Sequence, residues 1–318
     1  MNPLLQSILI AFGILMVVLT LSSALIMIER RLLALWQERI GPNRVGPFGL
    51  LQVVADTFKI LWKEDWIAPF ADKTVFVIAP AVIMVTVLIS FSVVPFTESI
   101  YVARQDIGLL LFLAMSSMGV YSVVLAGWSS NNKYALLGGL RSSAQMLSYE
   151  VFMGLSIMGV VLQAGSLDLW DIVEAQKGLW FCVPQFLGFV LFLIAGIAEM
   201  HRLPFDIPEA ESELVAGFHS EYSGMKFGMF FVGEYSGVLL ISSIATALFL
   251  GGWHGPFLPP VVWFFLKVLG FICFFILLRA ALPRPRFDQL LAFSWKICLP
   301  LALVNLLVTG AIVVATGK

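Results

Sequence analysis

Two glutamates, Glu150 and Glu234, stand inside long apolar stretches of the sequence. A carboxylate well inside a membrane span costs at least about 2.5 kcal/mol, and by default it marks an ion or proton pathway. Burial favours the neutral form of a carboxyl group, which allows it to take up and release protons. We therefore interpret both glutamates as proton-path residues. The alternative is that one of them simply pairs with Lys267 or an arginine.

A second group of carboxylates gathers between residues 199 and 221, where Arg202 is the only cation. Its members are Glu199, Asp206, Glu209, Glu211, Glu213 and Glu221. Such a cluster is usually a solvated acidic face, but the residues around it, at 203–205 and 214–218, are too apolar for a freely solvated loop. A functional acidic path is therefore favoured.

The sequence offers few ligands for metals or redox cofactors. Its cysteines, Cys182, Cys273 and Cys298, show no CxxC or other ligand spacing, so this chain alone cannot hold an iron–sulfur cluster. The histidines, His201, His219 and His254, are not spaced as HxxxH or HExxH, and loop or packing roles are favoured for them. We expect no metal site, no catalytic residue of its own and no cofactor bound by this chain.

The composition identifies a membrane protein. Of the 318 residues, 60% are hydrophobic and 12% are charged, and the mean hydropathy is +0.96. These values lie far outside the usual range of soluble domains. The net charge of -1 excludes a generally basic nucleic-acid binder.

Long gaps between charges predict an all-α, polytopic fold with eight transmembrane helices in a single domain over residues 1–318. A bilayer core of about 30 Å needs roughly 20 apolar residues of helix, and each gap is long enough or admits a single charge. The predicted spans are 4–28, 75–97, 107–127, 144–164, 181–199, 227–250, 259–280 and 294–315.

An amphipathic helix is predicted at about 48–64, in the first cytoplasmic loop. Gln52, Asp56, Lys59 and Lys63 recur at helical spacing and form a narrow polar stripe on an otherwise apolar helix. The helix is expected to lie in the membrane plane. The stripe is either solvated, or it faces a polar cavity or a partner subunit.

Most of the 19 Lys and Arg residues fall in the segments after the first, third, fifth and seventh spans. Because basic residues concentrate on the cytoplasmic side, we expect both termini to face outward.

Six sequence blocks follow one another along most of the chain. They are Glu29-Arg30-Arg31 with Gly41-Pro42-Asn43 and residues 49–64; Gly127-Trp128-Ser129-Ser130; Ser148-Tyr149-Glu150; residues 204–214, which begin Pro204-Phe205-Asp206; Gly233-Glu234-Tyr235; and residues 279–290, which begin Arg279-Ala280-Ala281-Leu282-Pro283. Together they resemble membrane subunit 1 of respiratory complex I, the proton-pumping NADH:quinone oxidoreductase. Residues 206–211 read Asp-Ile-Pro-Glu-Ala-Glu where many relatives carry Ala-Glu-Gly-Glu, which leaves the local turn open and is closer to bacterial members.

The resemblance implies a subunit at the junction of the membrane and peripheral arms. Quinone, the substrate, would bind in a cavity formed by the first span, the in-plane helix and the sixth and seventh spans. Electrons would come from an iron–sulfur cluster on a hydrophilic neighbour, with FMN and NADH also on partner subunits. Carried over by position, the quinone-cavity candidates are Arg30, Asp56, Lys59, Phe227, Arg279 and Arg284. The proton-path candidates are Glu150, Glu199, Asp206, Glu209, Glu211, Glu213, Glu221 and Glu234.

The same resemblance implies partners and a location. The partners would be the hydrophilic quinone-site subunits, the iron–sulfur subunit, small membrane subunits and antiporter-like subunits, with membrane lipids around them and no nucleic acid. The expected location is the bacterial cytoplasmic (inner) membrane; the mitochondrial inner membrane is the alternative.

Two other interpretations compete with this one. A stand-alone ion transporter would be expected to show paired repeats, and none is found in the sequence. The homologous component of a membrane-bound hydrogenase or formate-oxidising complex would share the architecture without reducing quinone, and the retained quinone-side loop weighs against it.

Overall fold

The computed structural model of the chain describes residues 3–206 and 215–316, and every regular element in these residues is helical. Seven helical stretches of the described chain are long and apolar enough to cross a membrane. They are α1 (Pro3–Trp36), α3 (Lys73–Ser90), α4 (Gly108–Ser129), α5 (Lys133–Ala164), α9 (Gly224–Phe249), α10 (Pro260–Ala281), and the continuous stretch of α11 (Phe287–Phe293), a π-helical turn (Ser294–Cys298) and α12 (Leu299–Thr316). The prediction of an all-helical protein with many membrane spans is confirmed.

The remaining elements are shorter. The fifth predicted span corresponds to α7 (Phe186–Glu199), which is apolar but has 14 residues, or about 21 Å of helix. The amphipathic segment forms α2 (Gln52–Trp62). Between the longer helices lie α6 (Leu169–Ala175) and the short turns η1 (Pro47–Gly49), η2 (Phe91–Val93) and η3 (Gly217–His219).

Several helices extend beyond the apolar stretches that predicted them. α1 continues to Trp36 instead of ending near residue 28, because the residues after its charged triplet are again apolar helix formers. α5 begins at Lys133 instead of 144, where the Asn132 side chain caps the helix by accepting a hydrogen bond from the Tyr134 N–H at 2.9 Å. Glu29 therefore lies on α1 as part of a helix and not in a loop.

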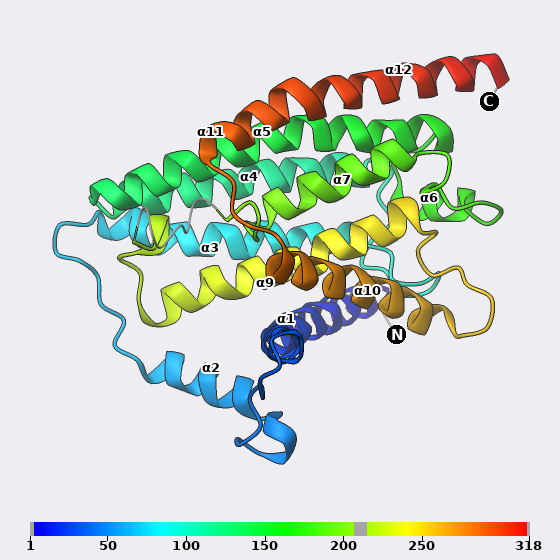
Figure 1. Cartoon of the computed structure of the whole chain (residues 1–318). Helices are drawn as coiled ribbons and strands as arrows, with labels where there is room; N and C mark the ends of the chain where they lie inside the picture. Colours follow the sequence, from blue (N-terminus) through cyan, green and yellow to red (C-terminus); the bar gives the residue numbers. More distant parts are fainter. Residues whose placement is uncertain (1–2, 207–214, 317–318) are drawn as a thin grey trace.

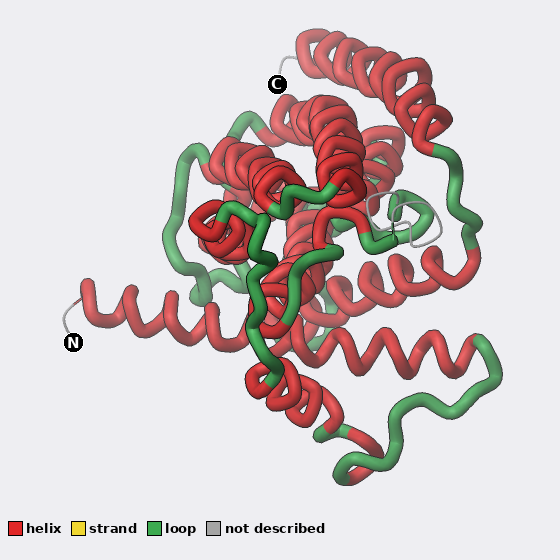
Figure 2. The backbone as a smooth tube through the Cα atoms, turned by 90° about the vertical axis from the view of Figure 1, so that its left-hand side faces the viewer, coloured by secondary structure: helices red, strands yellow, loops and turns green. Residues whose placement is uncertain are grey.

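The helices pack side by side with one exception in direction. In Figure 2 several of them are seen end-on, whereas α1, which starts at the N mark, lies across the view. α9 is covered on most sides, and α12 runs beside α5 at the edge of the molecule (Figure 1). The core between α5, α7 and α9 holds fully buried aromatic side chains, among them Phe152, Phe192 and Phe249. α2 stands apart from this bundle, near the end of α1 (Figure 1).

Glycines let α4 and α5 approach closely. A Cβ atom on Gly127 of α4 would lie 2.6 Å from the Ala135 carbonyl oxygen, and one on Gly139 of α5 would lie 3.1 Å from the Val123 carbonyl oxygen. Small residues at helix interfaces are the usual means of tight packing in membranes. This contact brings the next turns of the two helices, which carry Ser116 and Glu150, within hydrogen-bond distance.

Candidate functional site

Two carboxylates from different helices meet at one hydroxyl group. Glu150 lies in the middle of α5, and Glu199 is the last residue of α7. Ser116 Oγ on α4 lies 2.9 Å from Glu150 Oε1 and 2.7 Å from Glu199 Oε1. Ser117 Oγ lies 3.0 Å from the other oxygen of Glu150. The structure thus brings two of the predicted proton-path residues together.

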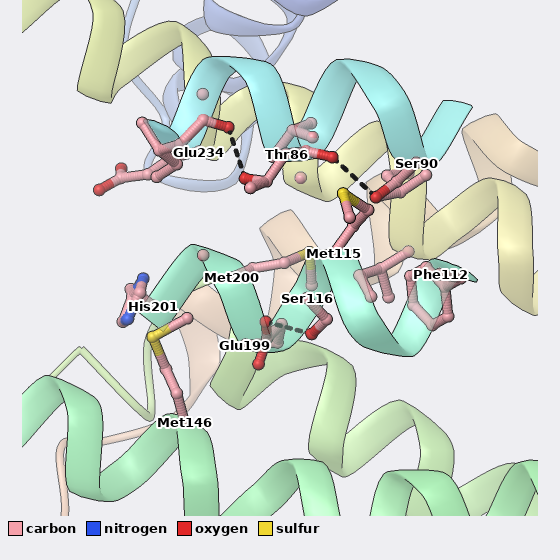
Figure 3. A pocket seen from close by; sticks show the side chains of 17 residues that line it. Thr86, Ser90, Phe112, Met115, Ser116, Met146, Glu199, Met200, His201 and Glu234 are labelled. Atoms are coloured by element: carbon pink, nitrogen blue, oxygen red, sulfur yellow. Dashed lines mark hydrogen bonds between the residues drawn. The ribbon is translucent and has the colours of Figure 1, made fainter. Parts of the chain in front are cut away.

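A cavity of about 70 Å³ borders this pair. Figure 3 shows Glu199 and Ser116 on one side of it and Glu234, from α9, on the other side with Thr86. His201 lines the same cavity. The volume suffices for a few water molecules, and the polar groups that water needs are present. A proton could therefore pass between carboxylates that do not touch directly.

The chain that follows α7 is held in place by α5. Gln145 Nε2 donates hydrogen bonds to the carbonyl oxygens of Ala198 (3.1 Å) and Phe205 (2.8 Å). Three residues before it on α5, Ser142 Oγ lies 2.8 Å from His201 Nε2. His201 has a φ of 51°, a conformation that is uncommon for residues other than glycine. These contacts fix the position of His201 at the edge of the cavity.

A second, smaller cavity of about 20 Å³ lies on the far side of the same residues. His201 and Glu234 line the first cavity, whereas their chain neighbours Arg202 and Tyr235 line the second. The two cavities are therefore separated by little more than the backbone of these residues.

A buried cluster of charges surrounds the second cavity. Glu29 of α1 is only 6% exposed. Its carboxylate pairs with Arg279 of α10 and lies 3.5 Å from Arg202. The Arg202 guanidinium also lies 4.3 Å from the centre of the Tyr235 ring, a cation–π geometry. One carboxylate thus faces two guanidinium groups, and the cluster has excess positive charge.

Further ion pairs connect the loops on the α2 side of the molecule. Arg30 pairs with Asp56 of α2 at 3.0 Å, and Arg284 pairs with Asp206 at 3.1 Å. Lys226 at the start of α9 pairs with Asp65 after α2. The first and last of these pairs attach α2 to α1 and α9.

The other predicted site residues occupy varied positions. Lys59 is exposed on α2. Phe227 is half-buried, and its ring packs against Phe231 and the edge of His219. Glu221 accepts a hydrogen bond from Asn132 Nδ2 at 2.7 Å. Glu209, Glu211 and Glu213 lie outside the described residues.

An apolar groove of about 700 Å³ separates α1 from α2. Its wall includes Leu19, Ala24, Met27, Leu50, Val54 and Phe58. The hydroxyls of Thr20, Ser23 and Thr57, which also line it, donate to carbonyl groups of their own helices. Their polarity is thereby satisfied within the helices, and the groove presents mostly hydrocarbon.

Lys267 is not the partner of either intramembrane glutamate. Its Nζ donates to the carbonyl oxygens of Leu250 (2.6 Å), Gly252 (2.9 Å) and His254 (2.8 Å) at the end of α9. Leu250 is about 24 Å along the helix from Glu234. The simple pairing with Lys267 that the sequence left open is therefore wrong.

Sequence reasoning missed four residues of this region. Glu29 and Tyr235 lay within recognised blocks but carried no assigned role, His201 was interpreted as a loop residue, and Ser116 was not noticed. Glu29 could have been found as an acid flanked by apolar helix formers on both sides. Ser116 gave no signal, because serine is common in membrane helices.

Comparisons with known proteins agree on one family. The sequence model of the NADH dehydrogenase family matches residues 8–310. A NADH-quinone oxidoreductase subunit, the one lettered H, from Methylococcus capsulatus (strain Bath) is 62% identical over 304 residues, which cover 95% of this chain and 96% of that protein.

Proposed function

The chain belongs to the NADH dehydrogenase family as a bacterial membrane subunit 1 of NADH-quinone oxidoreductase, and from this premise we propose that it binds quinone and couples quinone reduction to proton translocation. The observation that carries the proposal is the back-to-back position of the two cavities. One holds the Glu29, Arg202 and Arg279 charges, and the other holds Glu199 and Glu234.

Quinone has a long apolar tail and a polar head, and the groove between α1 and α2 suits the tail. The groove is lined by hydrocarbon along its length and reaches Arg31 near the charged part of α1. Arg30, Asp56, Lys59, Phe227, Arg279 and Arg284 line or flank the path of the head group. We assign Lys59, which is exposed, to the side that meets the hydrophilic partner subunits.

Coupling is electrostatic. When the bound quinone is reduced and protonated, the charge beside the Glu29 cluster changes. Interactions between charges are strong in a medium of low dielectric constant, and interacting carboxyl groups titrate as a unit. The change therefore shifts protons between Glu234, Glu199 and Glu150 across the shared cavity. Asp206, Glu221 and the acids at 209, 211 and 213 extend this path at the α2 side.

The protein forms a single transmembrane domain with eight spans. α7 is the eighth, completed by the apolar segment 179–185 that precedes it. An even number of spans places both termini on one side, which the basic residues assign to the periplasm. α2 lies in the plane of the bacterial inner membrane with its apolar face towards the lipid or the groove. Iron–sulfur clusters, FMN and NADH belong to hydrophilic partners, and antiporter-like subunits receive the coupling.

A quinone carrying a photoreactive group on its tail tests this proposal. Illumination of the assembled complex, followed by peptide mapping, is expected to label residues of the groove within 19–31 and 50–61. Excess unmodified quinone should abolish the labelling. Labelling confined to other helices of this chain, with the groove unmodified, would contradict quinone binding at this place.

A further inference from the structure

Ser116 uses its hydroxyl differently from most hydroxyl groups in these helices. Serine and threonine side chains in a helix commonly donate to the carbonyl oxygen four residues before them. Ser22, Ser130 and Thr246 do so here, at 2.7–2.8 Å. Ser116 Oγ instead lies within 2.9 Å of two carboxylate oxygens, one from α5 and one from α7. Its contacts are therefore with ionisable groups of two other helices.

The arithmetic of hydrogen atoms restricts the state of these three residues. A hydroxyl has one hydrogen to donate and two lone pairs to accept with, whereas an ionised carboxylate can only accept. If both glutamates were ionised, Ser116 could donate to one of them, and the oxygen of the other would face its lone pairs at 2.9 Å or less. The geometry is satisfied when one of the two carboxyl groups carries a proton and donates it to Ser116.

The surroundings indicate which glutamate holds the proton. Glu150 has a hydroxyl at each of its oxygens, from Ser116 and Ser117. Glu199 Oε2 is buried, and no group among the described residues hydrogen-bonds to it. An unpartnered buried oxygen is much less costly on a neutral carboxyl group than on a carboxylate. The negative charge therefore rests on Glu150 and the proton on Glu199.

We propose that Ser116 is a proton bridge between Glu199 and Glu150, and that the pair shares one proton. In a transfer step, the O–H bond of Glu199 breaks as its proton binds Ser116 Oγ. The original O–H bond of Ser116 breaks at the same time, and that proton binds Glu150. One proton has then moved from Glu199 to Glu150, Ser116 is again a neutral hydroxyl, and the net charge of the pair is unchanged.

This inference rests on the proposed function for its consequence, because the bridge matters to turnover only if protons cross the pair. Glu199 borders the cavity that also contains Glu234, whereas Glu150 lies beyond Ser116. The bridge therefore connects the cavity to the next carboxylate on α5.

The test compares three variants in the assembled complex reconstituted into vesicles. Ser116→Ala removes the bridge, and Ser116→Thr keeps the hydroxyl. Ser122→Ala is the matched control, since Ser122 lies on the same helix, is buried, and donates to the Ala79 carbonyl oxygen at 2.7 Å instead of a carboxylate. Native gels and NADH oxidation with an artificial electron acceptor confirm that each complex is assembled.

We expect proton pumping and quinone-linked NADH oxidation to fall at least about tenfold in Ser116→Ala, a modest share of the gain that positioned proton transfer supplies. Ser116→Thr and Ser122→Ala should stay within about twofold of the unmodified complex. Wild-type pumping in Ser116→Ala, or an equal loss in Ser122→Ala, would overturn the bridge. If Glu150→Gln is impaired in the same assay, the bridge alone has failed; if Glu150→Gln pumps normally, the proposed function has failed.

Infrared difference spectra, recorded on reduction by NADH, provide a readout that packing alone would not change. The protonated-carboxyl band is expected in the unmodified complex and in Ser122→Ala, displaced in Ser116→Ala, and lost in Glu199→Gln. A band at the same position in the unmodified complex and in Ser116→Ala would overturn the hydrogen bond on which the bridge depends.

Discussion

Glu29 of α1 forms an ion pair with Arg279 of α10, which joins helices at opposite ends of the sequence. The carboxylate is buried, so it depends on Arg279 and Arg202 for its charge balance. In the proposed function, these guanidinium groups are the charges closest to the reacting quinone head, and they translate its reduction into a field at the carboxylates.

Replacing Arg279 is expected to weaken quinone binding. Arg279→Ala removes a cation from the second cavity and leaves Glu29 with Arg202 alone. A charged hydrogen bond contributes roughly 1.5–3 kcal/mol, so the KM for quinone should rise about tenfold or more while NADH oxidation with an artificial acceptor is unchanged. Steady-state kinetics with a short-chain quinone measures this. Unchanged quinone kinetics would exclude Arg279 from the cavity.

α12 is expected to depend on a small polar cluster for its attachment. Asn305 Nδ2 donates to Gln185 Oε1 at 2.9 Å, and Gln185 Nε2 donates to Thr309 Oγ1 at 2.7 Å. Interhelical hydrogen bonds in membranes contribute about 0.6 kcal/mol each.

Asn305→Ala should therefore lower stability by roughly 1 kcal/mol and speed hydrogen exchange in α12, with quinone-linked turnover retained. Leu307→Ala is a suitable control, because Leu307 is exposed on the same helix. Equal exchange in the two variants would show that the cluster does not hold α12.

The loop between α9 and α10 is expected to loosen in acid. Burial lowers the pKa of His254 below its ordinary value of 6.5, and this outweighs the nearby Glu174 carboxylate. Because the unfolded loop binds the proton more readily than the folded loop, stability falls as the pH drops through 6.5 towards the lowered folded value.

Protection of residues 250–259 against hydrogen exchange, corrected for the intrinsic rate at each pH, should therefore decrease below pH 6.5. His254→Asn should abolish this dependence. Protection that rises on acidification would mean that pairing of protonated His254 with Glu174 dominates instead.

Much of the architecture could be predicted because charges are scarce. In a chain that is 12% charged, gaps between charges identify membrane helices almost directly. Their ends were less predictable, since local capping by residues such as Asn132 sets them. α7 was harder still, because an apolar run does not reveal how much of it is helix.

The candidate site could be predicted only in part. Glu150 and Glu199 were identified as acids in apolar surroundings, but their meeting at Ser116 depends on how α4, α5 and α7 pack, which no sequence spacing encodes. Glu29 was hidden because an acid beside Arg30 and Arg31 resembles an ordinary charged helix end. In three dimensions it is buried against residues from α10 and the segment after α7.

The central claim is that protons pass through the Glu150 and Glu199 pair, and Glu150→Gln tests it most directly. The glutamine keeps the shape of the side chain and cannot carry the exchanging proton. Glu98→Gln, an exposed position between α3 and α4, is the matched control. In vesicles containing the assembled complex, we predict that Glu150→Gln lowers NADH-driven proton pumping and quinone reduction at least about tenfold, with Glu98→Gln unaffected. Normal pumping in assembled Glu150→Gln complex would contradict the account.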